Sequence, residues 1–148
     1  MSFNISASGL EAQRIRMNVI ANNIANAQTT RTEDGGPYRR RAAVFEAVGG
    51  TKSRFARVLE GAEKVRVLGG GVRVSEILEA TDAEAFMDVF EPSHPDADAK
   101  GMVKKPNIRV VDEMVNLIDA SRAYEANVTA MNTTKQMATK TLEIGRVS

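Results

Sequence analysis

One stretch decides the fold of this chain: IRVVDEMVNLIDASRAYEANVTAMNTTKQMATKTLEI, residues 108–144. Its positions of apolar or small residues recur at alternating spacings of three and four, the pattern of a helix with one adhesive face. The repeating positions are Val110, Met114, Leu117, Ser121, Tyr124, Val128, Met131, Lys135, Ala138 and Leu142. The spacing predicts a helix of about 37 residues and about 55 Å. A compact chain of this size has a radius of gyration of only about 15 Å, so we expect the helix to overhang its own domain or to lie along another subunit.

The N-terminal segment repeats the same pattern over a shorter length. The repeating positions are Phe3, Ser6, Leu10, Gln13, Met17, Ile20, Ile24 and Ala27. They predict a second helix that starts between Ser2 and Ser8 and ends before the loop at Thr29–Pro37. Two helices with adhesive faces at opposite ends of the chain indicate a subunit that assembles with others.

The middle of the chain, residues 31–107, follows a different pattern. Residues 38–48 are typical of a strand, and the alternating runs Lys64–Leu68 and Val72–Ile77 flank three glycines, as a hairpin would. The stretch Glu91–Lys105 is rich in turn-forming residues, which predicts mostly loop. We therefore expect a mainly α fold with a small β-rich insertion.

Composition excludes several classes of function. With no cysteine the chain has no disulfide, no cysteine-bound zinc and no thiol nucleophile. Its 20 basic and 19 acidic residues give a net charge of +1, which predicts no general attraction to nucleic acid. No run of 18 apolar residues exists, and the N-terminus lacks the pattern of a cleaved signal peptide.

The candidate sites for chemistry are weak. The single histidine, His94, precedes Asp96 and Asp98, but a calcium-binding loop starting at Asp96 would need oxygen ligands where Lys100 and Asn107 stand. A transition-metal site would need further ligands from elsewhere, so a turn is favoured. Residues 39–41, three arginines, are interpreted as a solvated strand edge rather than a phosphate site. The sequence predicts no enzyme, no cofactor and no metal.

Three separated stretches resemble one known family. The motif Ala21-Asn22-Asn23-Ile24-Ala25-Asn26 resembles the signature of flagellar rod and hook axial proteins. Within that family, subunits of the proximal rod are similar at residues 30–40 with 44–46, at 94–101 with Pro106-Asn107, and at 111–118 with 121–124 and 131–133. The resemblance spans nearly the whole chain except about residues 47–85. Met102, Ser93 and Lys104-Lys105 depart from the usual pattern.

The resemblance implies a structural subunit of the bacterial flagellar proximal rod. Such subunits form the hollow drive shaft of the basal body in the periplasmic space, and the flagellar type III export apparatus exports them without a cleaved signal peptide. Residues 1–30 and 108–148 would pair as an antiparallel coiled coil in an inner domain, and residues 31–107 would form an outer portion. The implied partners are copies of the same chain, other proximal and distal rod proteins, and the membrane-ring adapter protein. Neither a nucleic acid nor a small-molecule substrate is expected.

This interpretation assigns roles to named residues. Subunit packing is expected from Leu10, Met17, Ile20 and Ile24 against Met114, Leu117, Tyr124, Val128 and Met131. Asn22, Asn23 and Asn26 are expected to donate amide hydrogen bonds where helix ends meet, because buried polar groups need partners. The hairpin-like loop at residues 91–107 is the candidate for contacts specific to this rod position. Its residues of interest are His94, Pro95, Asp96, Asp98, Gly101, Pro106 and Asn107.

Four alternatives stay open at this point. The loop at residues 91–107 is equally consistent with a solvent-facing hairpin tip. The chain is also consistent with a different axial rod subunit, or with a free-standing coiled-coil adaptor. An enzyme that uses a metal at His94, Asp96 and Asp98 is the alternative from another class, and metal analysis of the purified protein would reveal it.

Overall fold

The structure, a computed structural model, describes residues 2–49 and 70–145. Two long helices, α1 (Ser2–Ala25) and α4 (Val110–Gly145), are accompanied by two β-hairpins. One hairpin consists of β1 (Arg41–Ala47) and β2 (Val72–Glu79), and the other of β3 (Phe86–Phe90) and β4 (Met102–Pro106). A single short turn of helix, α3 (Asp82–Ala85), joins the hairpins. None of the helices in these ranges is long and apolar enough to cross a membrane.

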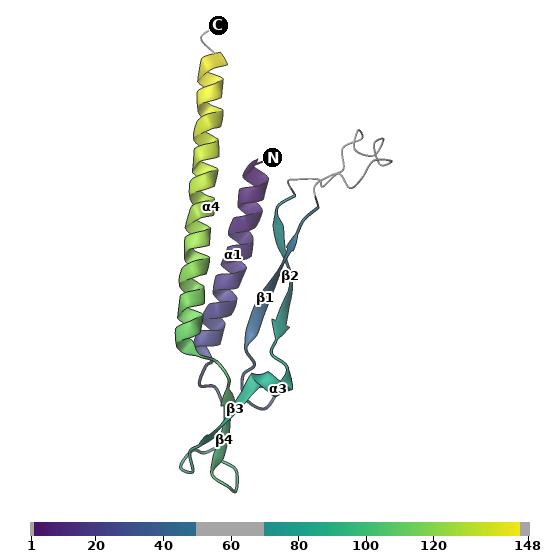
Figure 1. Ribbon diagram of the computed structural model, residues 1–148, viewed down its shortest axis with the longest axis vertical. Coiled ribbons are helices and arrows are strands. Elements are labelled where there is room, and N and C mark those ends of the chain that lie inside the picture. Colours follow the sequence, from purple (N-terminus) through teal and green to yellow (C-terminus); the bar gives the residue numbers. More distant parts are fainter. Residues whose placement is uncertain (1, 50–69, 146–148) are drawn as a thin grey trace, which may run out of the picture.

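Figure 1 shows α1 and α4 side by side, with the β1–β2 hairpin on the other side of α1 and the β3–β4 hairpin at the end where α1 stops and α4 starts. The prediction of a mainly α fold with a small β-rich region is confirmed. The helix α4 has 36 residues against 24 in α1, so it measures about 54 Å against about 36 Å. Its C-terminal part therefore extends past the first turn of α1 (Figure 1).

The buried line of α4 differs from the predicted one. Glu113 and Ala120 are its buried residues, whereas Met114 is 53% exposed. The predicted positions Leu117 and Tyr124 lie on this line and are half-buried, but Glu113 and Ala120 take the places predicted for Met114 and Ser121. The pattern of apolar residues misplaces the line because a glutamate and an alanine occupy it.

The buried line on α1 combines small, polar and branched apolar residues. Ile20 is buried as predicted, together with Ala12, Val19 and Asn23, while Leu10, Met17 and Ile24 are half-buried. Near its start α1 meets α4 at Gly9, where an added Cβ would lie 2.9 Å from Oδ1 of Asn127. The helices thus come together over residues with short side chains, which allows a close approach.

The first hairpin pairs segments distant in sequence. β1 and β2 are antiparallel, with Arg41 opposite Glu79 and Ala47 opposite Val72. The predicted strand at Lys64–Leu68 lies outside the described residues, and the partner of β2 is β1. Gly71 has a φ of +92°, and the next residue, Val72, donates its backbone N–H to Oγ of Ser8 at 3.1 Å, which ties the start of β2 to α1.

The second hairpin corrects the prediction that Glu91–Lys105 is mostly loop. Met102–Pro106 forms β4, antiparallel to β3, and only residues 91–101 form the connecting loop. In β4 Val103 and Pro106 are buried while Lys104 is exposed. Pro106 is tolerated because it is the last residue of an edge strand, opposite Phe86.

Where α1 ends and α4 begins, a small cluster of buried side chains packs together. It contains Ala27, Tyr38 and Ile108, which come from the segment after α1, the approach to β1 and the approach to α4. This cluster lies beside the polar contacts that hold the same three segments together, so apolar and polar packing meet at one junction.

Candidate functional site

The centre of the junction is Asn23, on the last turns of α1. Its side chain is completely buried and uses both ends of its amide. Nδ2 donates to the backbone oxygen of Arg41 at 2.8 Å and to Oε2 of Glu113 at 2.9 Å. Oδ1 accepts from the backbone N–H of Arg41 at 2.9 Å and from the Tyr38 hydroxyl at 3.2 Å. One side chain therefore joins α1 to β1 and to α4.

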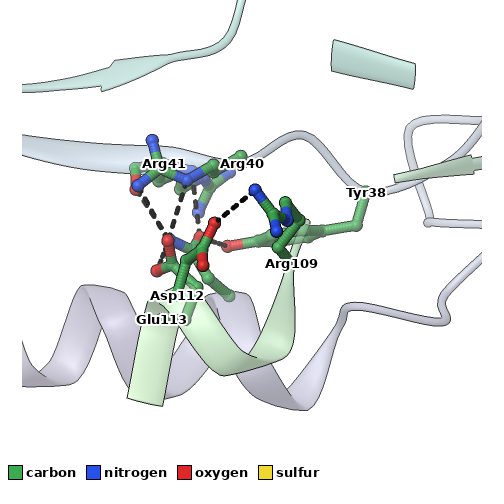
Figure 2. Close-up of polar contacts among 7 residues, drawn as sticks. Tyr38, Arg40, Arg41, Arg109, Asp112 and Glu113 are labelled. Atoms are coloured by element: carbon green, nitrogen blue, oxygen red, sulfur yellow. Dashed lines mark hydrogen bonds and ion pairs between the residues drawn. The ribbon is translucent and has the colours of Figure 1, made fainter. Parts of the chain in front are cut away.

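Glu113 carries the acidic charge of the junction, in the first turn of α4. Its side chain is 2% exposed, and its other oxygen, Oε1, accepts from Nε and Nη2 of Arg40 at 2.9 and 2.7 Å. Figure 2 shows Arg40 facing Glu113, with the Tyr38 side chain directed toward the same cluster. The carboxylate is thus fully hydrogen-bonded and neutralised, which burial of a charge requires.

The three successive arginines each hold a different part of the chain. Arg39 donates to the backbone oxygen of Ala80 at 3.4 Å and stacks over the ring of Phe86. Arg40 binds Glu113, and Arg41 pairs with Glu79 at 2.7 Å across the first hairpin. The prediction of a solvated strand edge fits Arg41, which is exposed in β1, whereas Arg39 and Arg40 lie before the strand and bind partners on other elements. Together the three side chains link residues 39–41 to β3, α4 and β2.

Burial changes the ionisation of the tyrosine in this cluster. Desolvation raises the pKa of the Tyr38 phenol above 10, and the nearby Arg41 guanidinium offsets part of the rise. The hydroxyl therefore stays protonated at neutral pH and keeps donating to Asn23.

The asparagines of the predicted motif do different things. Only Asn23 bridges elements, whereas Asn22 is exposed and contributes its backbone oxygen, which accepts from the backbone N–H and from Nδ2 of Asn26. Oδ1 of Asn26 accepts from the Thr29 hydroxyl at 3.2 Å. Asn22 and Asn26 thus end the helix locally. Ile24 is half-buried and Ala25, the last residue of α1, is exposed.

The loop between β3 and β4 is held by its own residues. Oδ1 of Asp98 accepts the backbone N–H groups of Lys100 and Met102 at 2.8 and 2.9 Å, and Gly101 has a φ of +77°. Nδ1 of His94 accepts the backbone N–H of Asp96 at 3.1 Å. These are turn contacts, so the geometry of the loop itself accounts for these three residue types.

Further contacts anchor the loop to the rest of the molecule. Oδ2 of Asp96 accepts from the Thr30 hydroxyl at 2.7 Å, and the Lys105 ammonium donates to Glu91 at 2.6 Å. That hydrogen bond holds the pKa of the Glu91 carboxyl below its usual value. Asn107 bonds the backbone oxygens of Ala85 and Glu84. Pro95 remains exposed, as does Phe90 at the base of the loop, which is 66% exposed.

In the described part of the chain, no three histidine or acidic side chains come close enough to hold a metal ion. His94 and Asp98 turn their acceptor atoms to backbone N–H groups of the loop. The residues named in the metal-enzyme alternative therefore have structural partners.

The predicted packing residues lie in three environments. Ile20 is buried at the α1–α4 contact; Leu10, Met17, Ile24, Leu117, Tyr124, Val128 and Met131 are half-buried; and Met114 is exposed. Sequence reasoning missed Tyr38, Arg40 and Glu113 as the junction that joins the two helices. The acidic first turn of α4 was the available signal, but it indicated only a favourable interaction with the helix dipole.

Comparison with known proteins shows which families share parts of this sequence. Residues 3–31 match the family described as "Flagella basal body rod protein", and residues 99–144 match "Flagellar basal body rod FlgEFG protein C-terminal". The two matches fall on α1 with the segment after it and on β4 with α4. The terminal parts of the chain are thus those that the family shares.

Relatives cover nearly the full length. The flagellar basal-body rod protein FlgC of Bacillus subtilis (strain 168) is 45% identical over 150 residues, which span 98% of this chain and 97% of that protein. FlgC of Escherichia coli O6:H1 is 43% identical, over 97% of this chain and 96% of that protein. FlgC of Aquifex aeolicus is 39% identical, over 96% and 93%. The chain therefore belongs to the FlgC family of flagellar basal-body rod proteins and is a structural subunit of that rod, not an enzyme.

Proposed function

We propose that this chain builds the proximal part of the rod, and that α1 and α4 pair as an antiparallel coiled coil in the inner wall of a hollow shaft. Residues 1–30 and 108–148 would form this inner domain, and residues 31–107 the outer portion. The antiparallel course of the two helices in Figure 1 supports the pairing. The alternating spacing of three and four residues along both helices supports the coiled coil.

The observation that carries this proposal is the unsupported length of α4. Its last turns leave Met137, Leu142 and Ile144 between 58% and 74% exposed. Thr133, Thr139 and Thr141 turn their hydroxyls back onto the carbonyl four residues earlier, contacts that do little to stabilise a helix by themselves. Isolated helical segments of this kind are marginal in water, so neighbouring subunits would have to support them.

The partners proposed are copies of this chain, other proximal and distal rod proteins, and the membrane-ring adapter protein. Assembly would take place in the periplasmic space after passage through the flagellar type III export apparatus, without removal of a signal peptide. Neither nucleic acid nor a small-molecule substrate takes part.

The residues proposed to pack subunits are the buried Ile20, the exposed Met114 and the half-buried Leu10, Met17, Ile24, Leu117, Tyr124, Val128 and Met131. A residue such as Leu117 or Tyr124 touches its own chain on one side and leaves its other side for a neighbour. Met114 would lose its exposure only on assembly, so its proposed role is in contacts between subunits rather than within one.

The loop at residues 91–107 is proposed to make contacts specific to this rod position. Its turn residues, including Asp98 and Gly101, would present the exposed Pro95 and the adjacent Phe90 to a neighbour. Replacing the loop with that of another rod protein should then alter the order of assembly. Unchanged order would leave the loop as a solvent-facing hairpin tip.

The test of the packing proposal uses Leu117→Asp and Tyr124→Asp in cells that lack the native chain. Each change places a charge between packed helices, so we expect normal amounts of protein, no incorporation into basal bodies and no motility. Ala83→Asp is the matched control, since Ala83 is exposed on the short α3 and should tolerate the same added charge. Normal basal bodies with either helix variant would contradict the proposal.

A further inference from the structure

A groove with a volume of about 330 Å³ lies where α1, β1 and the start of α4 come together. Arginine side chains and apolar side chains share its lining. They include Arg16, Val19, Arg41, Ala43 and Phe45, and we call this hollow the basic groove. Such a combination of apolar surface and charge is typical of surfaces that bind another protein.

The basic groove keeps positive charge that the described part of the chain does not neutralise. Glu113 is the acid in its lining, and the carboxylate of Glu113 is already bound by Arg40. Arg41 pairs with Glu79, yet its side chain is still 49% exposed. The side chain of Arg16 forms no hydrogen bond and no ion pair with another described residue. An anionic group from outside the chain would therefore find guanidinium groups available here.

The turn at residues 32–36, between α1 and β1, carries the opposite charge, and we call it the acidic turn. Glu33 and Asp34 are exposed in it, and their side chains form no ion pair with another described residue. The backbone N–H of Thr32 donates to the backbone oxygen of Gly36 at 2.8 Å, which fixes the turn. Its two glycines have φ of +85° and +83°, and a Cβ added to either would meet no atom within 4 Å. The acidic turn thus projects from the molecule with two carboxylates near its tip.

We infer that the acidic turn of one copy of this chain docks in the basic groove of a second copy. The inference rests on the proposed function, because it requires copies of the chain to be neighbours in the rod. The two carboxylates of the turn then meet the guanidinium groups of Arg16 and Arg41. Hydrogen bonds between such charged groups are among the stronger ones in proteins. The turn can enter the groove because its glycines bring no side chains that would have to be accommodated.

Both surfaces lie toward the same end of the molecule. Figure 1 shows the chain between α1 and β1 near the end where α1 stops, and Arg16 lies about two and a half helical turns before the last residue of α1. Copies related mainly by a rotation about the rod axis can therefore bring turn and groove together. Because turn and groove are different surfaces, each copy offers one and receives one. Such a heterologous contact can continue from copy to copy around the rod.

The first experiment joins the two surfaces covalently and uses the absence of native cysteine. Glu33→Cys and Ala42→Cys are placed in separate, differently tagged chains, co-expressed in cells that lack the native chain. Ala42 lines the groove, and neither change removes an arginine. Basal bodies are treated with a short bifunctional maleimide, and we expect a linked pair that carries both tags. Ala7→Cys in place of Ala42→Cys is the matched control, because Ala7 is exposed near the start of α1, and it should give no linked pair.

Other results of this experiment overturn the inference. If both cysteine chains are in basal bodies and stay unlinked, turn and groove do not meet. If the Glu33→Cys chain links only to a different protein, the occupant of the groove is not a second copy. If a tagged native chain is itself missing from basal bodies, the proposed function fails and the inference with it. The native-chain sample thus separates the two failures.

Charge reversal tests the contact without cysteine, and it decides the matter if a cysteine chain fails to assemble. Arg16→Glu places an acid opposite the acidic turn, and we expect about tenfold fewer complete basal bodies. Glu33→Arg or Asp34→Arg in the same chain should restore them, since every copy then carries an exchanged pair. Arg14→Glu is the matched control, because Arg14 is exposed on another face of α1 and should tolerate the change. Normal numbers with Arg16→Glu, or restoration by neither turn variant, would overturn the inference.

Discussion

A single asparagine joins parts of this molecule that are far apart in sequence. Asn23 reaches Tyr38, Arg41 and Glu113, the last of which is 90 residues away. Its neighbour Asn22 is exposed and makes only a backbone contact within its helix. Two identical side chains in sequence thus have unequal roles, and this difference can be measured.

We predict that Asn23→Ala lowers the free energy of unfolding by about 2–4 kcal/mol, because it leaves the buried Glu113 carboxylate and the backbone N–H of Arg41 short of partners. Urea unfolding followed by circular dichroism measures this change. Asn22→Ala is the control, expected within about 0.5 kcal/mol of the native chain. Equal effects of the two variants would show that the junction does not depend on Asn23.

The buried phenol predicts a dependence on alkaline pH. Because the folded-state pKa of Tyr38 lies above the ordinary value of 10.0, its contribution to stability is complete below pH 10 and is lost as the pH rises through the folded-state value. We expect the free energy of unfolding to fall more steeply above pH 10 for the native chain than for Tyr38→Phe. Parallel pH profiles from urea unfolding would contradict this.

At this scale the sequence allowed only part of the site to be predicted. A turn at His94 and Asp98 was predicted, because the hydrogen bonds of a turn join residues that are close in sequence. The partners of Arg40 and Glu113 were not predicted, because 73 residues separate them and no local pattern records such a pairing. The contacts of Arg39 and Arg40 were not predicted for the same reason.

Among the elements, the two helices were the most predictable. Periodicity located both, with α4 two residues shorter at its start than the predicted Ile108 and α1 ending at Ala25 rather than near residue 30. The buried line of α4 was off by one position because Glu113 lies inside on account of its distant partners. An apolar pattern cannot reveal a buried acid whose neutralising arginine comes from another element.

The hairpins were less predictable. β1 and β2 pair across a long separation in sequence, so no local alternating pattern indicates that they are partners. In β4 two lysines and a proline obscured a strand whose buried residues are Val103 and Pro106. Short edge strands with few apolar residues give weak local signals.

The contact between α1 and α4 at Gly9 gives a prediction at the same scale. Gly9→Ala gains helix propensity of about 1 kcal/mol but pushes against the amide of Asn127. We expect little net change in the native chain and a gain of about 1 kcal/mol in an Asn127→Ala background. Thermal unfolding of the four chains of this cycle measures the coupling. The same gain in both backgrounds would mean that the helices do not touch there.

Over the described residues, 2–49 and 70–145, the molecule is extended and buries few side chains. A cluster of three buried residues lies at the junction of α1 and α4, while large apolar side chains are exposed along α4. A chain that buries so little by itself depends on neighbours for much of its stability. This arrangement suits a structural subunit of the basal-body rod, which membership of the FlgC family shows independently.

The central claim is that this chain is a structural part of the rod, and electron microscopy of basal bodies from cells with an in-frame deletion of its gene tests it most directly. We predict membrane rings without a complete rod, and full restoration by the native gene. Complete rods that carry hooks and filaments in the deletion strain would contradict the account.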